Sequence, residues 1–294
     1  MFECIQVAKN TYYIASPVNI GIYIEDTNKA WIIDSGLDAR IAKKIEKILL
    51  ENNWELKAII NTHSHADHIG GNKYLQDKYQ CPVYANGLDC LFIEHTFLSP
   101  MALWGAYPPH CLLAKSIMAE ESKATDISTI TLPQGFEVIP LYGHGLFMVA
   151  IKTPDNILFI ADELCSQYVL DKYGVPFNYH IEDYVKSLEK AKTLCADLFI
   201  PAHGQPTKDI LPLIDANILA VQHIKDFIYI CCETPIYFDK LMQMIFNHFG
   251  HELNFVQYAV VGCAVRSYLT WLYNSGEIEP ISIDNMLYWQ QKQK

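Results

Sequence analysis

The sequence AIINTHSHADHIGGNKYL, residues 58–75, contains the most informative motif of the chain. Three histidines and an aspartate, His63, His65, Asp67 and His68, directly follow an apolar run and the polar pair Asn61-Thr62. Residues two apart in an extended segment project to the same side, so His63 and His65 can hold one ion together. Asp67 and His68 stand where the chain turns into a helix and can face a second ion. Imidazole and carboxylate groups suit Zn²⁺. The absence of a cysteine ligand argues against a closed structural zinc site.

Four ligands on one loop cannot complete the coordination of two ions, so partners must come from elsewhere in the chain. Three candidates follow later apolar segments with the pattern of β-strands. His144 follows the strand predicted at 136–140, Asp162 the strand predicted at 157–160, and His203 the strand predicted at 198–201. An isolated His or Asp at a strand end is usually a turn residue. Three of them, in a chain that already contains the loop cluster, favour a single metal centre.

The motifs THSHADH, GH, AD and AHG occur in this order and resemble those of the metallo-β-lactamase superfamily, more closely its glyoxalase II-like hydrolases. The resemblance covers residues 1–212. It implies an α+β fold, a four-layer αβ/βα sandwich with the metals at one edge. It also implies that His63, His65 and His144 hold the first ion. The second ion would then be held by Asp67, His68 and His203, with Asp162 bridging both.

The resemblance implies a dinuclear hydrolase, in which a metal-bridging hydroxide attacks a carbonyl or phosphoryl centre and the cations stabilise the oxyanion. Asp67 is the catalytic candidate, because it can also pass a proton to the leaving group. Asp34, in IIDSG, matches a supporting position of the family. Two divalent cations are expected, zinc first, with iron or manganese as alternatives for a His and carboxylate site.

The loop after His144 departs from the family pattern, which usually has Ser or Thr at the next position. Gly145 stands there, and the bulky Phe147 follows, which argues against glyoxalase II activity itself. We expect the substrate wall to come from residues 166–180 and from 96–122, an apolar lid-like insertion or, alternatively, a helical excursion that completes the core. The candidate substrate contacts are Phe147, Tyr173, Tyr179 and His180. Aromatic packing beside a helix start is the alternative interpretation for the residues of the 166–180 segment.

Hydrophobic periodicity predicts the remaining elements. Strands are expected at 2–7, 11–15, 18–25, 29–34, 56–60, 82–85 and 149–153, besides those named above. Helices are expected at 40–52, 69–79, from 87 onward, at 181–195 and at 253–273. Residues 277–290 predict a hairpin that turns at Asp284-Asn285. Residues 1–212 are therefore predicted to form the catalytic domain, and residues 213–294 a mainly helical, winged-helix-like domain.

Charge and composition restrict the partners of the chain. Its 294 residues are 51% hydrophobic and carry a formal net charge of −11, so a buried core is expected and nucleic acid is a poor partner. Residues 221–294 contain five Lys or Arg and seven Asp or Glu, without the basic stripe of a nucleic-acid-binding face. This segment is expected to serve in packing, as a pocket wall or as a homodimer contact.

Cysteine usage and the N-terminal sequence bear on location. The nine cysteines form no C-x-x-C pair, which indicates free thiols in a reducing compartment. The first residues lack the pattern of a signal peptide, and no apolar run approaches the length of a membrane span. We therefore expect a cytoplasmic protein without a membrane partner.

Three functional hypotheses follow from the sequence. The leading hypothesis is a hydrolase of a small-molecule thioester, lactone or other carboxylic ester. The second is a phosphodiesterase or ribonuclease that uses the same metals. The third is a catalytically inactive metal-binding regulator, for which the altered loop after His144 is the one argument. All seven ligand positions are filled, which argues against loss of activity.

Overall fold

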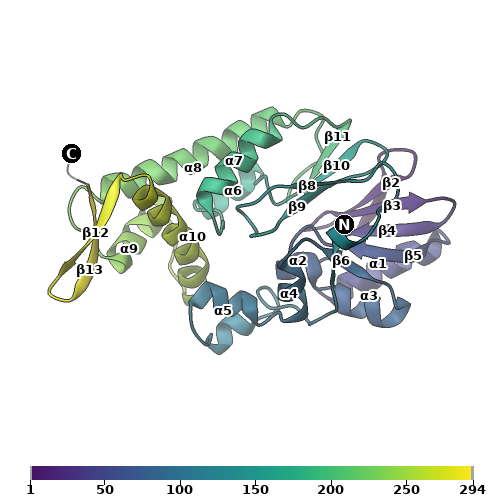
Figure 1. Ribbon diagram of the computed structural model, residues 1–294, viewed down its shortest axis with the longest axis horizontal. Coiled ribbons are helices and arrows are strands. Elements are labelled where there is room, and N and C mark those ends of the chain that lie inside the picture. The colour runs from purple at the N-terminus through teal and green to yellow at the C-terminus, as the bar shows by residue number, and fades with distance from the viewer. Residues whose placement is uncertain (1, 293–294) are drawn as a thin grey trace.

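Two β-sheets face each other across a shared apolar core in the computed structural model, which describes residues 2–292 (Figure 1). The larger sheet contains, in spatial order, β1 (Glu3–Gln6), β2 (Thr11–Ala15), β3 (Ile20–Glu25), β4 (Lys29–Ile33), β5 (Glu55–Ile60), β6 (Val83–Ala85) and β7 (Thr125–Asp126). The smaller sheet has the order β11-β10-β9-β8, formed by β8 (Glu137–Pro140), β9 (Val149–Lys152), β10 (Ile157–Ala161) and β11 (Leu198–Pro201). The strands predicted from hydrophobic periodicity are thus confirmed within a few residues.

Strand direction brings the candidate ligands to one edge. Strands β4 to β7 pair in parallel, as do β10 and β11, whereas β1 to β4 and β8 to β10 pair antiparallel. The carboxyl ends of parallel neighbours meet at the same edge of a sheet. The loops that follow β5, β10 and β11 can therefore converge there.

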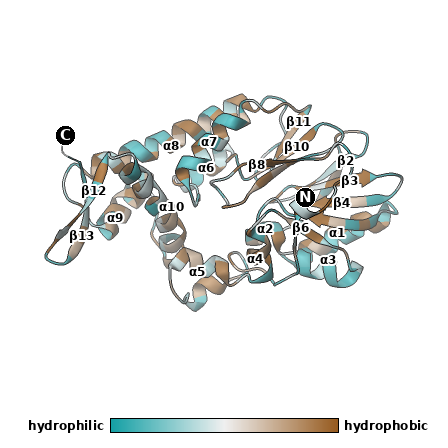
Figure 2. Ribbon diagram, viewed as in Figure 1, coloured by the Kyte–Doolittle hydropathy of each residue, from teal (hydrophilic) through white to brown (hydrophobic). Residues whose placement is uncertain are grey.

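Helices cover the outer face of each sheet and complete four layers. On the larger sheet, Ile45 and Leu49 of α1 (Ala39–Glu51) and Leu75 of α3 (Asn72–Tyr79) pack in one buried cluster with strand residues such as Ile32. On the smaller sheet, α7 (Ile181–Ala191) and α8 (Leu211–Cys231) share a cluster with Ile160. Figure 2 shows hydrophobic residues along the strands of the smaller sheet and hydrophilic residues on α1 and α3. The predicted α+β, αβ/βα sandwich is confirmed.

The helix expected at 69–79 is two helices, α2 (Ala66–Ile69) and α3, interrupted at Gly70-Gly71. The interruption follows from a close backbone approach. A Cβ atom on Gly70 would lie 1.9 Å from the carbonyl oxygen of Leu37, and one on Gly71 would lie 2.3 Å from that of Ser35. The glycine pair therefore lets the loop after β5, which carries the candidate ligands, pack directly against the turn after β4.

The 96–122 insertion connects two distant parts of the molecule. It follows α4 (Asp89–Glu94) and contains α5 (Leu98–Trp104) and the 3₁₀ helix η1 (His110–Leu113), and a second 3₁₀ helix, η2 (Ile127–Thr129), lies just beyond it. Trp104 contacts Phe255 near the C-terminal helices with ring centroids 5.0 Å apart, and Lys115 forms an ion pair of 2.7 Å with Asp38 before α1. Its role as a lid remains a prediction.

The C-terminal part is helical and ends in a hairpin. After α8 come α9 (Phe238–Phe249), α10 (Phe255–Asn274), β12 (Ile278–Ile283) and β13 (Met286–Gln291). Asp284 and Asn285 have φ angles of 50° and 61°, as the predicted two-residue turn requires. One buried cluster extends from Leu158 through α7 and α8 to Leu269, so the boundary at residue 212 stays a prediction. Within residues 2–292, no helix has both the length and the apolar character that crossing a bilayer requires.

Candidate metal centre

The seven predicted ligand residues meet at the carboxyl-end edge of the two sheets. The loop after β5 supplies His63, His65, Asp67 and His68, the last two from the short helix α2. The other three follow strands of the smaller sheet: His144 lies between β8 and β9, Asp162 directly follows β10, and His203 closely follows β11. Their donor atoms form two neighbouring groups: His63, His65, His144 and Asp162; and Asp67, His68 and His203.

Three ring nitrogens converge in the first group. The Nδ1 atom of His65 lies 2.9 Å from Nε2 of His63 and 3.0 Å from Nε2 of His144. The side chain of His63 is fully buried, and that of His144 is 10% exposed. Donor atoms this close to one another could together hold one metal ion.

Asp162 lies between the two groups. Its Oδ2 atom is 3.3 Å from Nε2 of His144 and 3.5 Å from Nε2 of His203, and its Oδ1 atom is 3.4 Å from Nε2 of His68. Nε2 of His203 is in turn 3.3 Å from Oδ2 of Asp67. One carboxylate therefore contacts histidines of both groups.

Outer partners fix the orientation of the rings. Nδ1 of His144 donates to the carbonyl oxygen of Phe177 at 2.9 Å, and Nδ1 of His203 donates to that of Pro17 at 2.9 Å. These contacts leave Nε2 of both rings facing the centre. The partner of His144 is thus a backbone carbonyl, although the sequence lacks the hydroxyl residue usual beside it.

Asp34 supports the other two buried rings. Its Oδ2 atom accepts hydrogen bonds of 2.8 Å from Nδ1 of His68 and from the hydroxyl of Thr62. Since the Thr62 hydroxyl proton is used there, its oxygen accepts from Nδ1 of His63 at 3.1 Å. Nε2 of His63 consequently carries a lone pair that points inward, and Nε2 of His68 also points inward, toward Asp162.

This donor set fits divalent cations. Nε2 of His68 and Oδ1 of Asp162 are buried without a hydrogen-bond partner among the described residues. The Nε2 lone pairs of His63 and His144 both face Nδ1 of His65. This nitrogen carries at most one proton, so it cannot donate a full hydrogen bond to both. Buried lone pairs of this kind need a positive partner, and imidazole and carboxylate donors suit zinc, iron and manganese.

Electrostatics favour the neutral, ligating form of His63 and His65 and the ionised form of Asp67. Burial, together with the neighbouring His68, lowers the pKa of His63 well below its usual value, and burial lowers that of His65 to about 3. Burial would raise the pKa of Asp67, but the neighbouring histidines lower it to about 2. Asp162 raises the pKa of His203 to about 10 against the effect of burial. The carboxylates of Asp67 and Asp162 thus favour positive charge in the second group. Either a proton on His203 or a bound cation can supply this charge.

A cavity of about 680 Å³ opens beside the centre. Its lining includes four of the predicted ligands, Asp67, His144, Asp162 and His203, and continues along α6 (Gln167–Tyr173) to α9 and α10. This size is typical of a small-molecule site. The sequence left a pocket wall open as one role of the C-terminal segment but named no residue of α9 or α10 for it, because their apolar spacing is equally typical of core packing.

The four candidate substrate contacts lie in different surroundings. Tyr173 lines the cavity. Phe147 packs against Gly87, and the ring of Tyr179 lies 6.2 Å from that of His65. His180 caps α7, since its Nδ1 atom accepts from the backbone N–H of Asp183. A role in substrate binding remains a prediction for all four.

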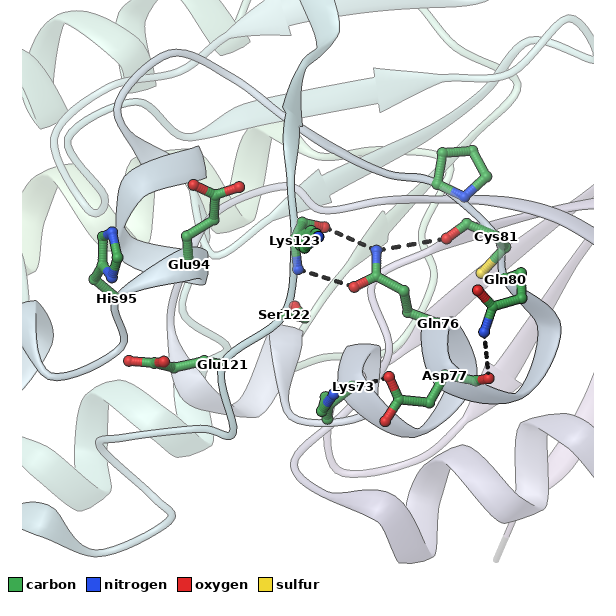
Figure 3. A pocket seen from close by; sticks show the side chains of 11 residues that line it. Lys73, Gln76, Asp77, Gln80, Cys81, Glu94, His95, Glu121, Ser122 and Lys123 are labelled. Atoms are coloured by element: carbon green, nitrogen blue, oxygen red, sulfur yellow. Dashed lines mark hydrogen bonds and ion pairs between the residues drawn. The ribbon is translucent and has the colours of Figure 1, made fainter.

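A second hollow, of about 750 Å³, lies away from the centre between α3, α4 and residues 121–123 (Figure 3). Several of its polar groups are paired with one another. The amide of Gln76 donates to the carbonyl oxygen of Lys123 at 2.9 Å and accepts from its N–H at 2.9 Å. None of the seven predicted ligands lines this hollow, and we assign it no function.

Comparisons with known proteins agree with this geometry. A family model described as the metallo-beta-lactamase superfamily matches residues 15–203. A hydroxyacylglutathione hydrolase of Prochlorococcus marinus (strain MIT 9312) is 26% identical over 214 residues, which are 70% of this chain and 73% of that protein.

Two solved structures resemble the chain over nearly its whole length. A beta-lactamase domain protein from Burkholderia ambifaria has a TM-score of 0.76 at 19% identity, with 99% of this chain and 94% of that chain covered. A metallo-beta-lactamase family protein from Thermus thermophilus has a TM-score of 0.72 at 15% identity, with 99% and 98% covered. At these identities the likeness shows the fold, including the C-terminal helices.

Proposed function

The chain belongs to the metallo-β-lactamase superfamily and is a metal-dependent hydrolase, and we propose that it cleaves a small thioester, lactone or other carboxylic ester at a centre of two divalent cations. The observation that carries the proposal is the position of Asp162, whose carboxylate contacts histidines of both ligand groups. A carboxylate in this position can bridge a pair of adjacent cations.

We assign the ligands as the two groups indicate. His63, His65 and His144 would hold one cation, Asp67, His68 and His203 the other, and Asp162 both. When bound, such cations make hydroxide available near neutral pH and stabilise the oxyanion that develops at the substrate. Zinc is the proposed metal, because a site of neutral imidazole and carboxylate ligands without cysteine is typical of catalytic zinc.

The residues of the chain contribute orientation and proton transfer. The hydrogen bonds of Asp34, Phe177 and Pro17 to the outer ring nitrogens hold the histidines in place before substrate arrives. Asp67 lines the cavity and its side chain is 32% exposed, so its carboxylate can take up a proton from the attacking group and return it to the leaving group.

The comparisons and the charge of the chain support a carbonyl substrate. The relative from Prochlorococcus marinus is named for hydroxyacylglutathione, a thioester. A nucleic acid would need a basic surface, whereas the chain has a net charge of −11 and the cavity lining includes one Lys and no Arg. A small carboxylic ester or thioester satisfies both observations.

Hydrolysis by the zinc-loaded protein tests the proposal. A glutathione thioester, an acyl-homoserine lactone and an activated phosphodiester are compared, with the His144→Ala variant as the blank and with metal content measured by mass spectrometry. Turnover of the thioester or the lactone, lost in the variant, supports the proposal. Turnover of the diester alone would overturn it in favour of a phosphodiesterase, and full metal occupancy without any turnover would favour an inactive metal-binding protein.

A further inference from the structure

We propose that the C-terminal helices α9 and α10 make the enzyme selective for substrates with an apolar acyl chain. This inference rests on the proposed ester or thioester hydrolysis and names the substrate class of that site. It gives the C-terminal helices a function that the sequence left open between packing, a pocket wall and a dimer contact.

The cavity leads directly from the candidate ligands to these helices. At one end it is lined by Asp67, His144, Asp162 and His203. The opposite wall is formed by α9 and the start of α10, which contribute the apolar side chains Ile245, Phe246, Phe249, Val256, Val260 and Val261. A substrate whose carbonyl group is at the ligands therefore extends one of its two substituents along this apolar wall.

The charge of the lining selects an apolar substituent. Among the residues that the structure describes, Lys172 is the only Lys or Arg in the lining. Its ammonium group lies over the rings of Tyr173 and Tyr168, 4.9 and 5.6 Å from their centroids. A glutathione group carries two carboxylates, and a single lysine cannot pair with both. Burying an unpaired carboxylate is costly, whereas burying methylene groups is favourable.

The apolar wall is held firmly in place. A Cβ atom on Gly174, at the end of α6, would lie 2.5 Å from Cγ of Phe249, so the ring of Phe249 packs directly on the backbone there. The Arg266 guanidinium lies 4.1 Å from the ring centroid of Phe238 and thereby joins α10 to α9. The Ser267 hydroxyl accepts a hydrogen bond of 3.0 Å from the N–H of Ile181, which joins α10 to α7. The wall is thus pre-formed, as a specificity pocket should be.

The positions of the polar groups decide which substituent faces the wall. The side chains of Asp67 and His203 are each 32% exposed, whereas those of the ligands His63, His68, His144 and Asp162 are at most 11% exposed. The leaving group must lie near Asp67 to receive a proton, and the Asp67 side chain, at the ligand end of the cavity, is partly exposed to solvent. The acyl chain therefore occupies the apolar part of the cavity, and the leaving group faces outward.

A series of p-nitrophenyl esters with acetyl, butyryl, hexanoyl and octanoyl groups tests this assignment on the metal-loaded protein. We expect kcat/KM to rise about threefold to fourfold per methylene, which corresponds to about 0.8 kcal/mol each, until the chain fills the cavity. In Val260→Phe, which adds bulk to the wall, the octanoyl-to-acetyl ratio of kcat/KM should fall at least tenfold. Val256→Phe provides a second variant at a neighbouring wall position in case the first does not fold.

Thr270→Phe is the matched control, because Thr270 has nearly the volume of valine and is exposed on the same helix. It should retain the octanoyl-to-acetyl ratio of the unmodified protein. An acyl series with a flat or falling kcat/KM, or equal effects of Val260→Phe and Thr270→Phe, would overturn the inference and leave the proposed hydrolysis intact.

Binding of 1-octanol, measured by displacement of an environment-sensitive fluorescent dye, adds a readout that needs no turnover. We expect octanol to bind the unmodified protein and Thr270→Phe at least tenfold more tightly than it binds Val260→Phe. If no ester is hydrolysed, the proposed function fails, whereas this difference in octanol binding still supports an apolar occupant of the cavity. Equal octanol binding by all three proteins would overturn the apolar occupant itself.

Discussion

The Nδ1 atom of His68 lies 2.8 Å from Oδ2 of Asp34, a carboxylate that comes directly after β4 and has a φ angle of 61°. The same carboxylate accepts the backbone N–H and the hydroxyl of Thr62, each at 2.8 Å. Through Thr62 it also determines the orientation of His63. A residue that contacts no substrate thus positions two of the histidines that face the proposed cations.

Replacing Asp34 with Asn should weaken metal binding roughly 10- to 100-fold, the usual effect of losing the outer partner of a ligand histidine. Asn tolerates the left-handed backbone at this position and has the shape of Asp, so the fold should be retained. Metal affinity is measured by competition with a chelator. Asp77→Asn, at an exposed position of α3, is the control, and equal affinities of the two variants would contradict a positioning role for Asp34.

The local part of the site could be predicted from the sequence. The spacing of His63, His65, Asp67 and His68 is a property of one loop, and the strand before Asp162 is a continuous apolar run. Strand β11 was predicted with the bounds that the structure has. Such features depend only on the spacing of nearby residues and on the hydrophobic pattern within one strand. Both are visible in a single sequence.

The rest of the site depends on contacts between distant segments. The partners of the His144 and His203 Nδ1 atoms are backbone carbonyl oxygens, which every residue has and no sequence pattern marks. The break at Gly70 depends on Leu37, a residue far away in the chain. The cavity residue Val260 lies on a helix whose apolar pattern also fits a buried core. Tertiary packing determines these contacts, so a local sequence pattern cannot predict them.

Replacing Asp162 with Ala should remove one or both cations, because its carboxylate contacts histidines of both ligand groups. Mass spectrometry after metal loading should find at most half the metal content of the unmodified protein, and hydrolysis should fall at least a hundredfold. Asp197→Ala, at the opposite end of the same pair of strands, should retain both. Full occupancy in Asp162→Ala would exclude the bridging assignment.

Asp38 stabilises the start of α1 in two ways that substitution can separate. Its side chain caps the helix by accepting from the N–H groups of Arg40 and Ile41, and it pairs with Lys115 of the insertion at 2.7 Å. Asp38→Ala should lower the free energy of unfolding by about 1 to 2 kcal/mol, whereas Asp38→Asn retains the cap and should cost less than about 1 kcal/mol. Chemical denaturation measures both. Equal losses in the two variants would mean that the cap contributes nothing.

The same aspartate predicts a dependence on pH. Lys115, with Arg40, holds the pKa of Asp38 well below its usual value, so the folded state favours the ionised form. The stabilisation is therefore complete above the unfolded pKa of about 3.9 and is lost as pH falls through the folded pKa. The difference in unfolding free energy between the unmodified protein and Asp38→Asn should be constant near neutral pH and shrink in acid. A difference that grows in acid would contradict the assignment.

Glu163 should reduce stability at neutral pH. Both of its carboxylate oxygens are buried without a hydrogen-bond partner among the described residues, and burial raises its pKa well above the usual value. In the unfolded chain a glutamate ionises near pH 4.3, so above about that pH folding must take up a proton. The cost grows by about 1.4 kcal/mol per pH unit until the folded pKa is reached.

The Glu163→Gln variant cannot ionise and escapes this cost. Its unfolding free energy, relative to the unmodified protein, should therefore increase between about pH 4 and pH 8. The measurement uses metal-free protein, because cations beside Asp162 would favour an ionised neighbour. Glu189→Gln, at an exposed position of α7, should show a difference that stays nearly constant over the same range. If the relative stability of Glu163→Gln also stayed constant or decreased, Glu163 would have to be ionised in the folded protein, because only an ionised carboxylate avoids the proton uptake.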